Sequence, residues 1–170
     1  LIAPTLSQAL AIELSAPLIS KPYVDMTVGC MREWGIKTQE EEGLRYVIPP
    51  NQKYRQTTYT IEGDYSSASY FFAIAALTRS DITVQNLSPT SRQADRKFLD
   101  ILKQMGNRVH YQEQSIRLEG RHILPLELSM EDCPDQILTL GVLAAFAKGT
   151  TIIRGTRSLR LKESDRVAAL

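Results

Sequence analysis

Two helical segments that are apolar on every side constrain this chain more than any other feature. Residues 66–77 (SSASYFFAIAAL) and 137–147 (ILTLGVLAAFA) are built almost entirely from apolar or small side chains. A helix of this composition has no polar face to present to water, so it must be buried all round. Each segment follows an aspartate, Asp64 or Asp135, and each is followed by a predicted strand. The chain therefore needs an architecture in which other elements surround both helices.

The same order of elements returns along the chain. Asp64 precedes Gln93-Ala94-Asp95-Arg96, and Asp135 precedes Glu163-Ser164-Asp165-Arg166, so the paired aspartates lie 31 residues apart in the first copy (64 to 95) and 30 in the second (135 to 165). The return of the same order of elements at nearly the same internal spacing indicates repeated supersecondary units. The unit is interpreted as βαβαββ, and the fold class as α/β (α+β).

The repeat also predicts how the chain is divided. Residues 20–48 match the helix–glycine–strand–strand half that returns at 92–118. The 170 residues then hold the end of one unit, one whole unit and the start of a third. We expect an internal fragment of a longer repetitive protein, with parts of two domains.

Local patterns predict the individual elements. Gly35 and Gly106 are expected to end helices, and Asp64 to begin one as its N-cap. Helices are predicted at 21–34, 66–77, 92–105 and 137–147, and another beginning near Glu163. Strands are predicted at 9–14, 36–38, 44–48, 57–61, 82–84, 109–111, 116–118, 126–128 and 151–153. The strands at 109–111 and 116–118 are expected to pair as a hairpin, and the helix at 92–105 is expected to have one apolar face.

Composition excludes several classes of protein. The formal net charge is +1, which gives no polycationic surface for nucleic acid or anionic membranes. No apolar run approaches the roughly 20 residues that span a bilayer. The two cysteines, Cys30 and Cys133, and the two histidines, His110 and His122, form no metal-ligand pattern. No leader is visible at the start of the sequence, so we expect a cytoplasmic protein with reduced thiols, without metal or cofactor.

Two clusters of residues are candidates for chemistry. Residues 20–23, Ser-Lys-Pro-Tyr, open a predicted helix, where free backbone N–H groups attract anions; a plain N-cap is the alternative. Residues 159–166 (LRLKESDR) place cations and carboxylates together at another predicted helix start. Lys162 and Arg166, four apart, are expected on one helix face, where they require a shared anion. A solvated charged turn is the alternative for this cluster.

Asp135 is a third candidate. It follows a proline and opens an apolar helix, where the helix dipole stabilises its charge while apolar neighbours raise its pKa. This combination suits a general base, and an N-cap is the alternative. The glycine spacing matches neither a dinucleotide fingerprint nor a P-loop, so redox chemistry and nucleotide hydrolysis have no support.

Four motifs resemble those of the 5-enolpyruvylshikimate-3-phosphate (EPSP) synthase family. LRLKESDR at 159–166 resembles the family's LR-x-KE-[ST]-DR signature, and GDYSSASY at 63–70 its GD-x-SSA-x-[YF] segment. Ser-Lys-Pro-Tyr at 20–23 and Asp-Cys-Pro-Asp at 132–135 resemble two further family segments. The resemblance implies domains of three βαβαββ units with their helices inside. Residues 1–62 would then end one enolpyruvyl transferase domain, and residues 63–170 would begin the second.

The resemblance also implies a reaction. Family members transfer the enolpyruvyl group of phosphoenolpyruvate to the 5-hydroxyl of shikimate 3-phosphate and release phosphate, within aromatic amino acid biosynthesis and without a metal or cofactor. By motif position, Asp135 resembles the family's proton acceptor and Glu163 its second catalytic carboxylate. The remaining matches are substrate ligands: Ser20 and Lys162 for shikimate 3-phosphate, Tyr23 along the shikimate ring, and Arg166 for phosphoenolpyruvate. The partners expected are these two small molecules, and the full-length parent is expected to be a monomer.

Several family segments have no match here, so we expect this chain alone to be nearly inactive. The missing segments include an N-terminal Lys-Ser motif, a glycine-rich loop and C-terminal cations. Two alternatives stay open. One is an enolpyruvyl transferase acting on UDP-N-acetylglucosamine, which would carry a reactive loop cysteine. The other is a non-catalytic folding unit that only binds anions.

Overall fold

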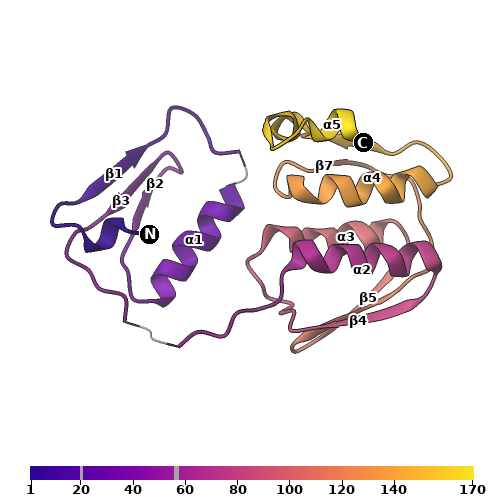
Figure 1. The fold of residues 1–170 in the computed structure, drawn as a ribbon, viewed down its shortest axis with the longest axis horizontal. Helices are drawn as coiled ribbons and strands as arrows, with labels where there is room; N and C mark the ends of the chain where they lie inside the picture. The colour runs from indigo at the N-terminus through magenta and orange to yellow at the C-terminus, as the bar shows by residue number, and fades with distance from the viewer. Residues whose placement is uncertain (20, 56–57) are drawn as a thin grey trace. The chain divides into compact units, whose positions relative to one another are not determined.

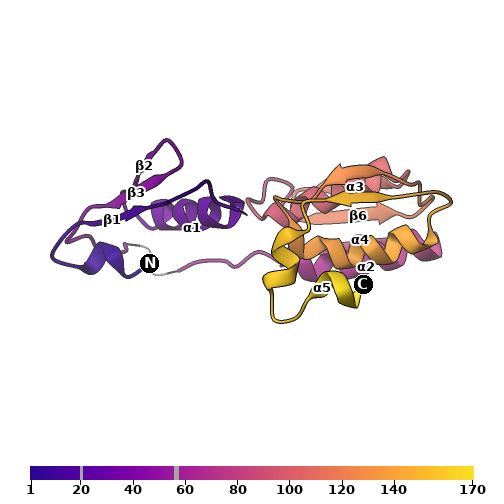
Figure 2. The same ribbon diagram turned by 90° about the horizontal axis from the view of Figure 1, so that it is seen from above.

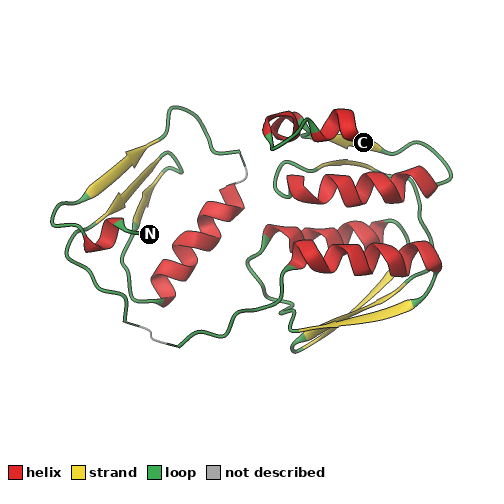
Figure 3. Cartoon of the chain, viewed as in Figure 1, coloured by secondary structure: helices red, strands yellow, loops and turns green. Residues whose placement is uncertain are grey.

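The computed structural model of this chain describes residues 1–19, 21–55 and 58–170 (Figures 1 and 3). They form two compact units, Leu1–Ile61 and Glu62–Leu170. Ser20, one of the candidate ligands, lies outside the described residues. Across the described residues, no helix has both the length and the apolar character that crossing a membrane requires.

The first unit packs one long helix with a three-stranded antiparallel sheet. Its elements are η1 (Ala3–Thr5), β1 (Leu10–Glu13), α1 (Lys21–Glu33), β2 (Gln39–Glu41) and β3 (Arg45–Ile48), with strand order β1-β3-β2. Gly35, at φ +82°, ends α1 as predicted. Tyr46 and Ile48 of β3 are buried with Ala3.

Two predicted strands of this unit are wrong. The strand predicted at 36–38 lies at Gln39–Glu41, because these residues pair with β3 in the register Gln39↔Val47 and Glu41↔Arg45. Residues 58–61 of the strand predicted at 57–61 are not in a strand, and residue 57 lies outside the described residues. An extended segment becomes a strand only when a neighbour takes its hydrogen bonds, and none of the described strands pairs with residues 58–61.

The second unit contains the rest of the repeat. Its first part is α2 (Tyr65–Thr78), β4 (Asp81–Gln85), η2 (Ala94–Arg96), α3 (Lys97–Gln104), β5 (Arg108–Gln112) and β6 (Ser115–Glu119). The second part is β7 (Glu127–Ser129), η3 (Pro134–Gln136), α4 (Ile137–Phe146), β8 (Ile152–Arg154), η4 (Arg157–Leu161) and α5 (Arg166–Ala169). Strands β4, β6 and β5 form an antiparallel sheet in that order, and β7 pairs in parallel with β8. The antiparallel pairing of β5 with β6 confirms the predicted hairpin.

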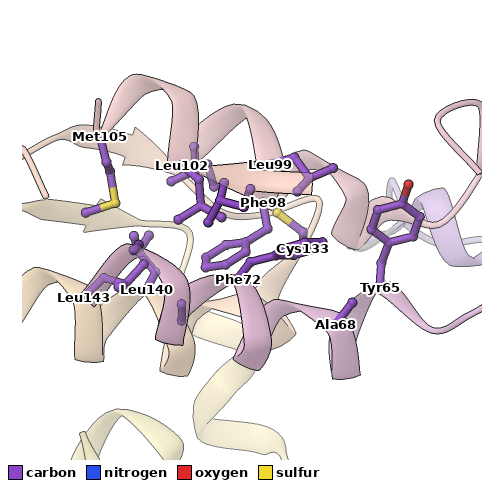
Figure 4. Close-up of a cluster of buried hydrophobic side chains, with 14 of the residues drawn as sticks. Tyr65, Ala68, Phe72, Phe98, Leu99, Leu102, Met105, Cys133, Leu140 and Leu143 are labelled. Carbon is purple, nitrogen blue, oxygen red and sulfur yellow. The ribbon is translucent and has the colours of Figure 1, made fainter. Parts of the chain in front are cut away.

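Helices α2 and α4 lie side by side in this unit, and the β4-β6-β5 sheet lies to one side of them (Figures 1 and 2). Phe72 of α2, Phe98 of α3 and Cys133 of the loop before α4 point into one buried cluster (Figure 4). Leu140 and Leu143 of α4 are fully buried in the same cluster. One apolar core therefore joins the two copies of the repeat.

The expectation that α2 and α4 are buried all round is wrong. Tyr70 and Phe71 of α2 are 61% and 54% exposed, and Phe146 of α4 is 67% exposed. The side chains that face the shared core are buried, whereas the exposed side chains face away from it. Leu170, the residue after α5, packs against Gly141 of α4.

The last helix begins later than predicted. It starts at Arg166, not near Glu163, because Asp165 caps it by accepting hydrogen bonds from the backbone N–H groups of Val167 and Ala168, both at 3.1 Å. Lys162 lies before this helix in extended backbone. Lys162 and Arg166 therefore do not share a helix face, and the spacing argument that paired them was wrong.

Candidate active site

Four of the six candidate residues meet at one place in the second unit. Asp135 lies in η3, the short turn that leads into α4. Lys162 and Glu163 follow η4, and Arg166 is the first residue of α5. Pro134 begins η3, where a missing N–H group is not needed by the helix. Two segments about 30 residues apart in sequence thus supply one charged cluster.

Asp135 is the centre of this cluster. Its Oδ1 atom lies 2.9 Å from Nη1 of Arg166 and 3.2 Å from Nζ of Lys162. The second guanidinium nitrogen of Arg166, Nη2, lies 2.8 Å from Oε2 of Glu163. The shared anion that two neighbouring cations require is therefore Asp135, although the cations reach it from different backbone conformations.

Exposure differs sharply among the four side chains. Arg166 is 23% exposed and Asp135 and Lys162 are each 32% exposed, whereas Glu163 is 81% exposed. The cluster is half-buried at its centre and open to solvent at Glu163. A ligand from solution would reach the Glu163 side first.

Contacts to Glu163 and Arg166 keep both residues charged. The pKa of Glu163 is lowered, first by a hydrogen bond from its own backbone N–H group and then by the Arg166 guanidinium. The pKa of Arg166 is raised, chiefly by its hydrogen bond to Glu163. The resting cluster therefore has a carboxylate, not a carboxylic acid, at position 163.

Asp165 positions this cluster, although it was not among the predicted site residues. Besides capping α5, its carboxylate accepts a hydrogen bond from Nη1 of Arg160 at 2.8 Å. The cap fixes where α5 begins, and with it the direction from which Arg166 approaches Asp135. An aspartate directly before a short helix is an N-cap signal that the sequence already contained.

A second contact joins the loop before Asp135 to the first copy of the repeat. Lys97, at the start of α3, forms an ion pair with Asp132. Cys133 follows Asp132 and is buried, and burial raises the pKa of its thiol to about 11. The loop is therefore fixed by the Lys97–Asp132 ion pair at the surface and by the buried Cys133 side chain in the core.

The remaining two candidates belong to the first unit. Tyr23 lies half-buried in the first turns of α1, where its carbonyl accepts a hydrogen bond from Thr27. Ser20 precedes α1 and is outside the described residues. The structure thus brings together Asp135, Lys162, Glu163 and Arg166 within the second unit.

The four charges of the cluster balance. Two cations face two carboxylates, so the resting cluster attracts neither sign strongly at long range. A phosphate or carboxylate group can take the place of either carboxylate on Lys162 or Arg166. Such an exchange would remove one cation contact from Asp135 or from Glu163 and leave that carboxylate beside the bound anion.

Known proteins with similar sequences share one description. The family model for EPSP synthase (3-phosphoshikimate 1-carboxyvinyltransferase) matches residues 1–170. A 3-phosphoshikimate 1-carboxyvinyltransferase of Syntrophobacter fumaroxidans is 41% identical over 169 residues, 99% of this chain and 40% of the relative. One of Methanococcus aeolicus is 40% identical over 163 residues, 93% of this chain and 38% of the relative. The chain thus spans about 40% of the length of the curated relatives it matches.

Solved structures show the same fold. An EPSP synthase of Acinetobacter baumannii aligns with a TM-score of 0.75 at 23% identity, covering 95% of this chain and 38% of that one. The enolpyruvyl transferase NikO of Streptomyces tendae aligns with a TM-score of 0.63 at 20% identity, covering 89% and 36%. These alignments confirm the predicted α/β class with parts of an enolpyruvyl transferase fold. With a family model that matches its whole length, the chain belongs to the EPSP synthase family.

Proposed function

We propose that this chain is part of a 3-phosphoshikimate 1-carboxyvinyltransferase, which transfers the enolpyruvyl group of phosphoenolpyruvate to the 5-hydroxyl of shikimate 3-phosphate. The observation that carries the proposal is the meeting of Lys162 and Arg166 on Asp135, beside Glu163. Both substrates are anions that need paired cations. Residues 1–62 are the end of one domain in this proposal, and residues 63–170 the beginning of the second.

Substrate binding acts in this proposal by exchanging ion pairs. Lys162 takes shikimate 3-phosphate, and Arg166 takes phosphoenolpyruvate. As each cation turns to a substrate anion, Asp135 loses a partner that stabilises its charge. The Asp135 carboxylate then lies beside the bound substrates, where it can accept a proton.

The reaction is an addition followed by an elimination. Asp135 accepts the proton of the 5-hydroxyl as the hydroxyl oxygen bonds to C2 of phosphoenolpyruvate, and Glu163, protonated once phosphoenolpyruvate is bound, donates a proton to C3, which turns the methylene into a methyl group. The tetrahedral intermediate then loses phosphate as the bond between C2 and the phosphate oxygen breaks, and the phosphate takes the proton from Asp135. Glu163 accepts a methyl proton at the same time, which restores the C2–C3 double bond. The cations stabilise the negative charge of the phosphate and carboxylate groups throughout.

Glu163 is the second carboxylate of this scheme. Its pKa is lowered in the resting cluster partly by Arg166, so it begins ionised. When Arg166 binds phosphoenolpyruvate, that contribution weakens and the pKa of Glu163 rises. Glu163 can then take up a proton and return it, as a group that serves both half-reactions must.

The other parts of the proposal come from motif positions. Ser20 binds the phosphate of shikimate 3-phosphate, and Tyr23 lies along the shikimate ring. The chemistry described needs no metal or cofactor. The full-length parent works as a cytoplasmic monomer.

A binding experiment tests the proposal on this chain. Shikimate 3-phosphate should raise the midpoint of thermal unfolding, since a ligand that binds only the folded state stabilises it. Lys162→Gln should remove most of that shift. The control is Lys53→Gln, which removes the same charge from an exposed lysine of the first unit and should leave the shift unchanged. Equal shifts in both variants would contradict the assignment of Lys162.

Turnover gives a separate prediction. The 170-residue chain mixed with both substrates should release phosphate at a rate close to the background. The chain lacks matches to several family segments that supply further cations, so the transition state would be incompletely stabilised. A phosphate release rate typical of enzymes, about 10 per second, would show that the 170 residues are a complete catalyst.

The enolpyruvyl transferase acting on UDP-N-acetylglucosamine is the second candidate. That reading needs a reactive cysteine, and a reactive cysteine needs a lowered thiol pKa. Cys133 is buried, and the pKa of its thiol is raised to about 11. Cys133 therefore does not supply the reactive thiol that this second candidate requires. A thermal shift with UDP-N-acetylglucosamine, and none with shikimate 3-phosphate, would reverse this choice. Binding of shikimate 3-phosphate by a complete parent enzyme that has no turnover would favour the non-catalytic alternative.

A further inference from the structure

A second group of cations lines a cavity at the opposite end of α2 and α4 from Asp135. The cavity has a volume of about 380 Å³ and lies where both helices end, whereas Asp135 precedes the start of α4. The helix α4 has 10 residues, so the two ends are about 15 Å apart. No residue of the Asp135 cluster lines this cavity.

All the titratable side chains that line this cavity are basic. Arg79, Arg121, His122 and Lys148 line the cavity, and no aspartate or glutamate does. Arg121 is paired with Glu119, its Nε atom lying 2.7 Å from Oε1. Among residues 1–19, 21–55 and 58–170, no acidic side chain forms an ion pair with Arg79 or Lys148. A hollow lined by like charges concentrates the opposite charge from solution.

The wall that carries Arg121 and His122 is fixed in place. The Arg121 backbone N–H group donates to Oδ1 of buried Asn107 at 2.9 Å, and the Leu124 N–H group donates to the carbonyl of Met105 at 2.9 Å. Gly120 packs so closely on α2 that a Cβ atom there would lie 1.9 Å from the carbonyl oxygen of Ala75. The cavity is therefore preformed, which lowers the cost of ordering it around a ligand.

Helix ends explain only part of this arrangement. A cation at a helix C-terminus complements the helix dipole, and Arg79 and Lys148 follow α2 and α4 in this way. Arg121 and His122 lie in the loop after β6 and do not follow the C-terminus of a helix. Arg79 also occupies a left-handed position, φ +53°, that glycine adopts at less cost. The dipole does not account for an arginine there.

The cavity also offers apolar surface. Phe146 is 67% exposed and Leu124 is 50% exposed, and both line the cavity beside the cations. Small-molecule sites combine apolar lining with placed polar groups, in volumes of about 300–1,000 Å³, and this cavity has both, with a lining that is more polar than apolar. The lining thus matches a ligand that has a charged group and a flat apolar body.

We propose that this cavity is a second anion site, separate from the Asp135 cluster, for a small ligand that joins a phosphate or carboxylate group to an aromatic ring. Arg79 and Lys148 bind the anionic group, and Phe146 and Leu124 contact the ring. The site does not depend on the carboxyvinyl transfer proposed above, since the two share no residue.

The test uses the 170-residue chain with phenyl phosphate as the probe. Calorimetry measures the affinity, and backbone amide shifts map the contacts. We expect binding that shifts the amides of Arg79, His122 and Lys148, with inorganic phosphate binding more weakly because it lacks the ring. Arg79→Gly and Lys148→Gln should each weaken phenyl phosphate binding about fivefold, as expected for loss of one partly exposed charged contact.

Folding failure is controlled in two ways. Arg79→Gly replaces a residue of positive φ with glycine, so its unfolding midpoint should not fall. Lys53→Gln removes one positive charge outside the cavity and should bind phenyl phosphate like the unaltered chain. Absence of binding, equal affinity in all variants, or shifts confined to Asp135 and Arg166 would each overturn the proposal.

Discussion

The two copies of the repeat use the same positions in opposite ways. In the first copy, Asp64 caps α2: its carboxylate accepts hydrogen bonds from the N–H groups of Ser66 and Ser67 at 3.0 and 3.1 Å, and from the Ser67 hydroxyl at 2.6 Å. In the second copy, Asp135 holds two cations instead. One aspartate therefore stabilises backbone, and the other is available for exchange with a ligand.

The second motif differs in the same direction. Gln93 accepts a hydrogen bond from the Tyr65 N–H group at 2.8 Å and donates one to the Gly63 carbonyl at 2.9 Å. Glu163, its counterpart, is 81% exposed and pairs with Arg166. The neutral amide of Gln93 forms hydrogen bonds within the first copy. The carboxylate of Glu163 is charged and exposed to solvent in the second copy. These two positions therefore stabilise the fold in the first copy, and they are available to a ligand in the second copy.

Exchanging these two side chains is the strongest way to break the comparison. In Gln93→Glu, the group that donates to the Gly63 carbonyl becomes an acceptor, so a partly buried hydrogen bond becomes a repulsion. We expect the free energy of unfolding to fall by about 1–3 kcal/mol. Denaturant unfolding at pH 7 measures this loss.

The reverse exchange is the matched control. Glu163→Gln changes an exposed side chain and should alter the free energy of unfolding by less than about 0.5 kcal/mol. In Gln93→Glu the deficit should shrink below about pH 4, where the introduced carboxyl becomes protonated and can donate again. Similar losses from both exchanges would show that the two copies are equivalent.

A smaller effect is expected at the cap of the first copy. Asp64→Ala should lower the free energy of unfolding by about 1 kcal/mol, the usual value of an N-cap side chain. Asp64→Asn keeps one of the two capping oxygens and should cost less than Asp64→Ala. Urea unfolding of both variants separates capping from charge.

The pH dependence of this effect has a definite sign. Burial by itself would raise the pKa of Asp64, but the Ser67 hydroxyl and the two N–H groups outweigh burial and lower it. The ionised cap therefore stabilises the fold above the unfolded pKa of about 3.9. This stabilisation is lost as the pH falls through the lower pKa of the folded state. A difference between Asp64→Asn and the unaltered chain that grows on acidification would contradict this account.

Local rules predicted most of the second unit. The Asp64 cap, the apolar face of α3 and the β5–β6 hairpin depend on residues close in sequence, and all three are confirmed. Non-local partners decided the failures. The strand predicted at 36–38 lies at Gln39–Glu41, because these are the residues that pair with β3. Residues 58–61 were predicted to be a strand, but they pair with no described strand.

Lys162 and Arg166 do meet, but the reason given for their meeting was wrong in part. Lys162 and Arg166 were placed together on a helix face, yet Lys162 lies in extended backbone before α5. They meet because both reach Asp135, about 30 residues earlier in sequence. A shared anion was the correct physical requirement. Its identity depended on the tertiary fold, which spacing alone does not give.

The smallest expected effect concerns the pKa of Glu163. Arg166→Gln should raise it towards its ordinary value, since one of the contacts that lower it is lost. The hydrogen bond from the residue's own N–H group remains, so the return should be partial. Carbon-13 NMR of the carboxyl group measures the titration. Arg160→Gln is the matched control: it should raise the pKa of Asp165 and leave that of Glu163 unchanged.

A map of the amide shifts that shikimate 3-phosphate causes in the isotope-labelled chain tests the separation of the two copies directly. The account predicts shifts around Asp135 and residues 162–166, and none around Asp64 or Gln93. Equal shifts in both copies, or shifts around Asp64 and Gln93 alone, would contradict it.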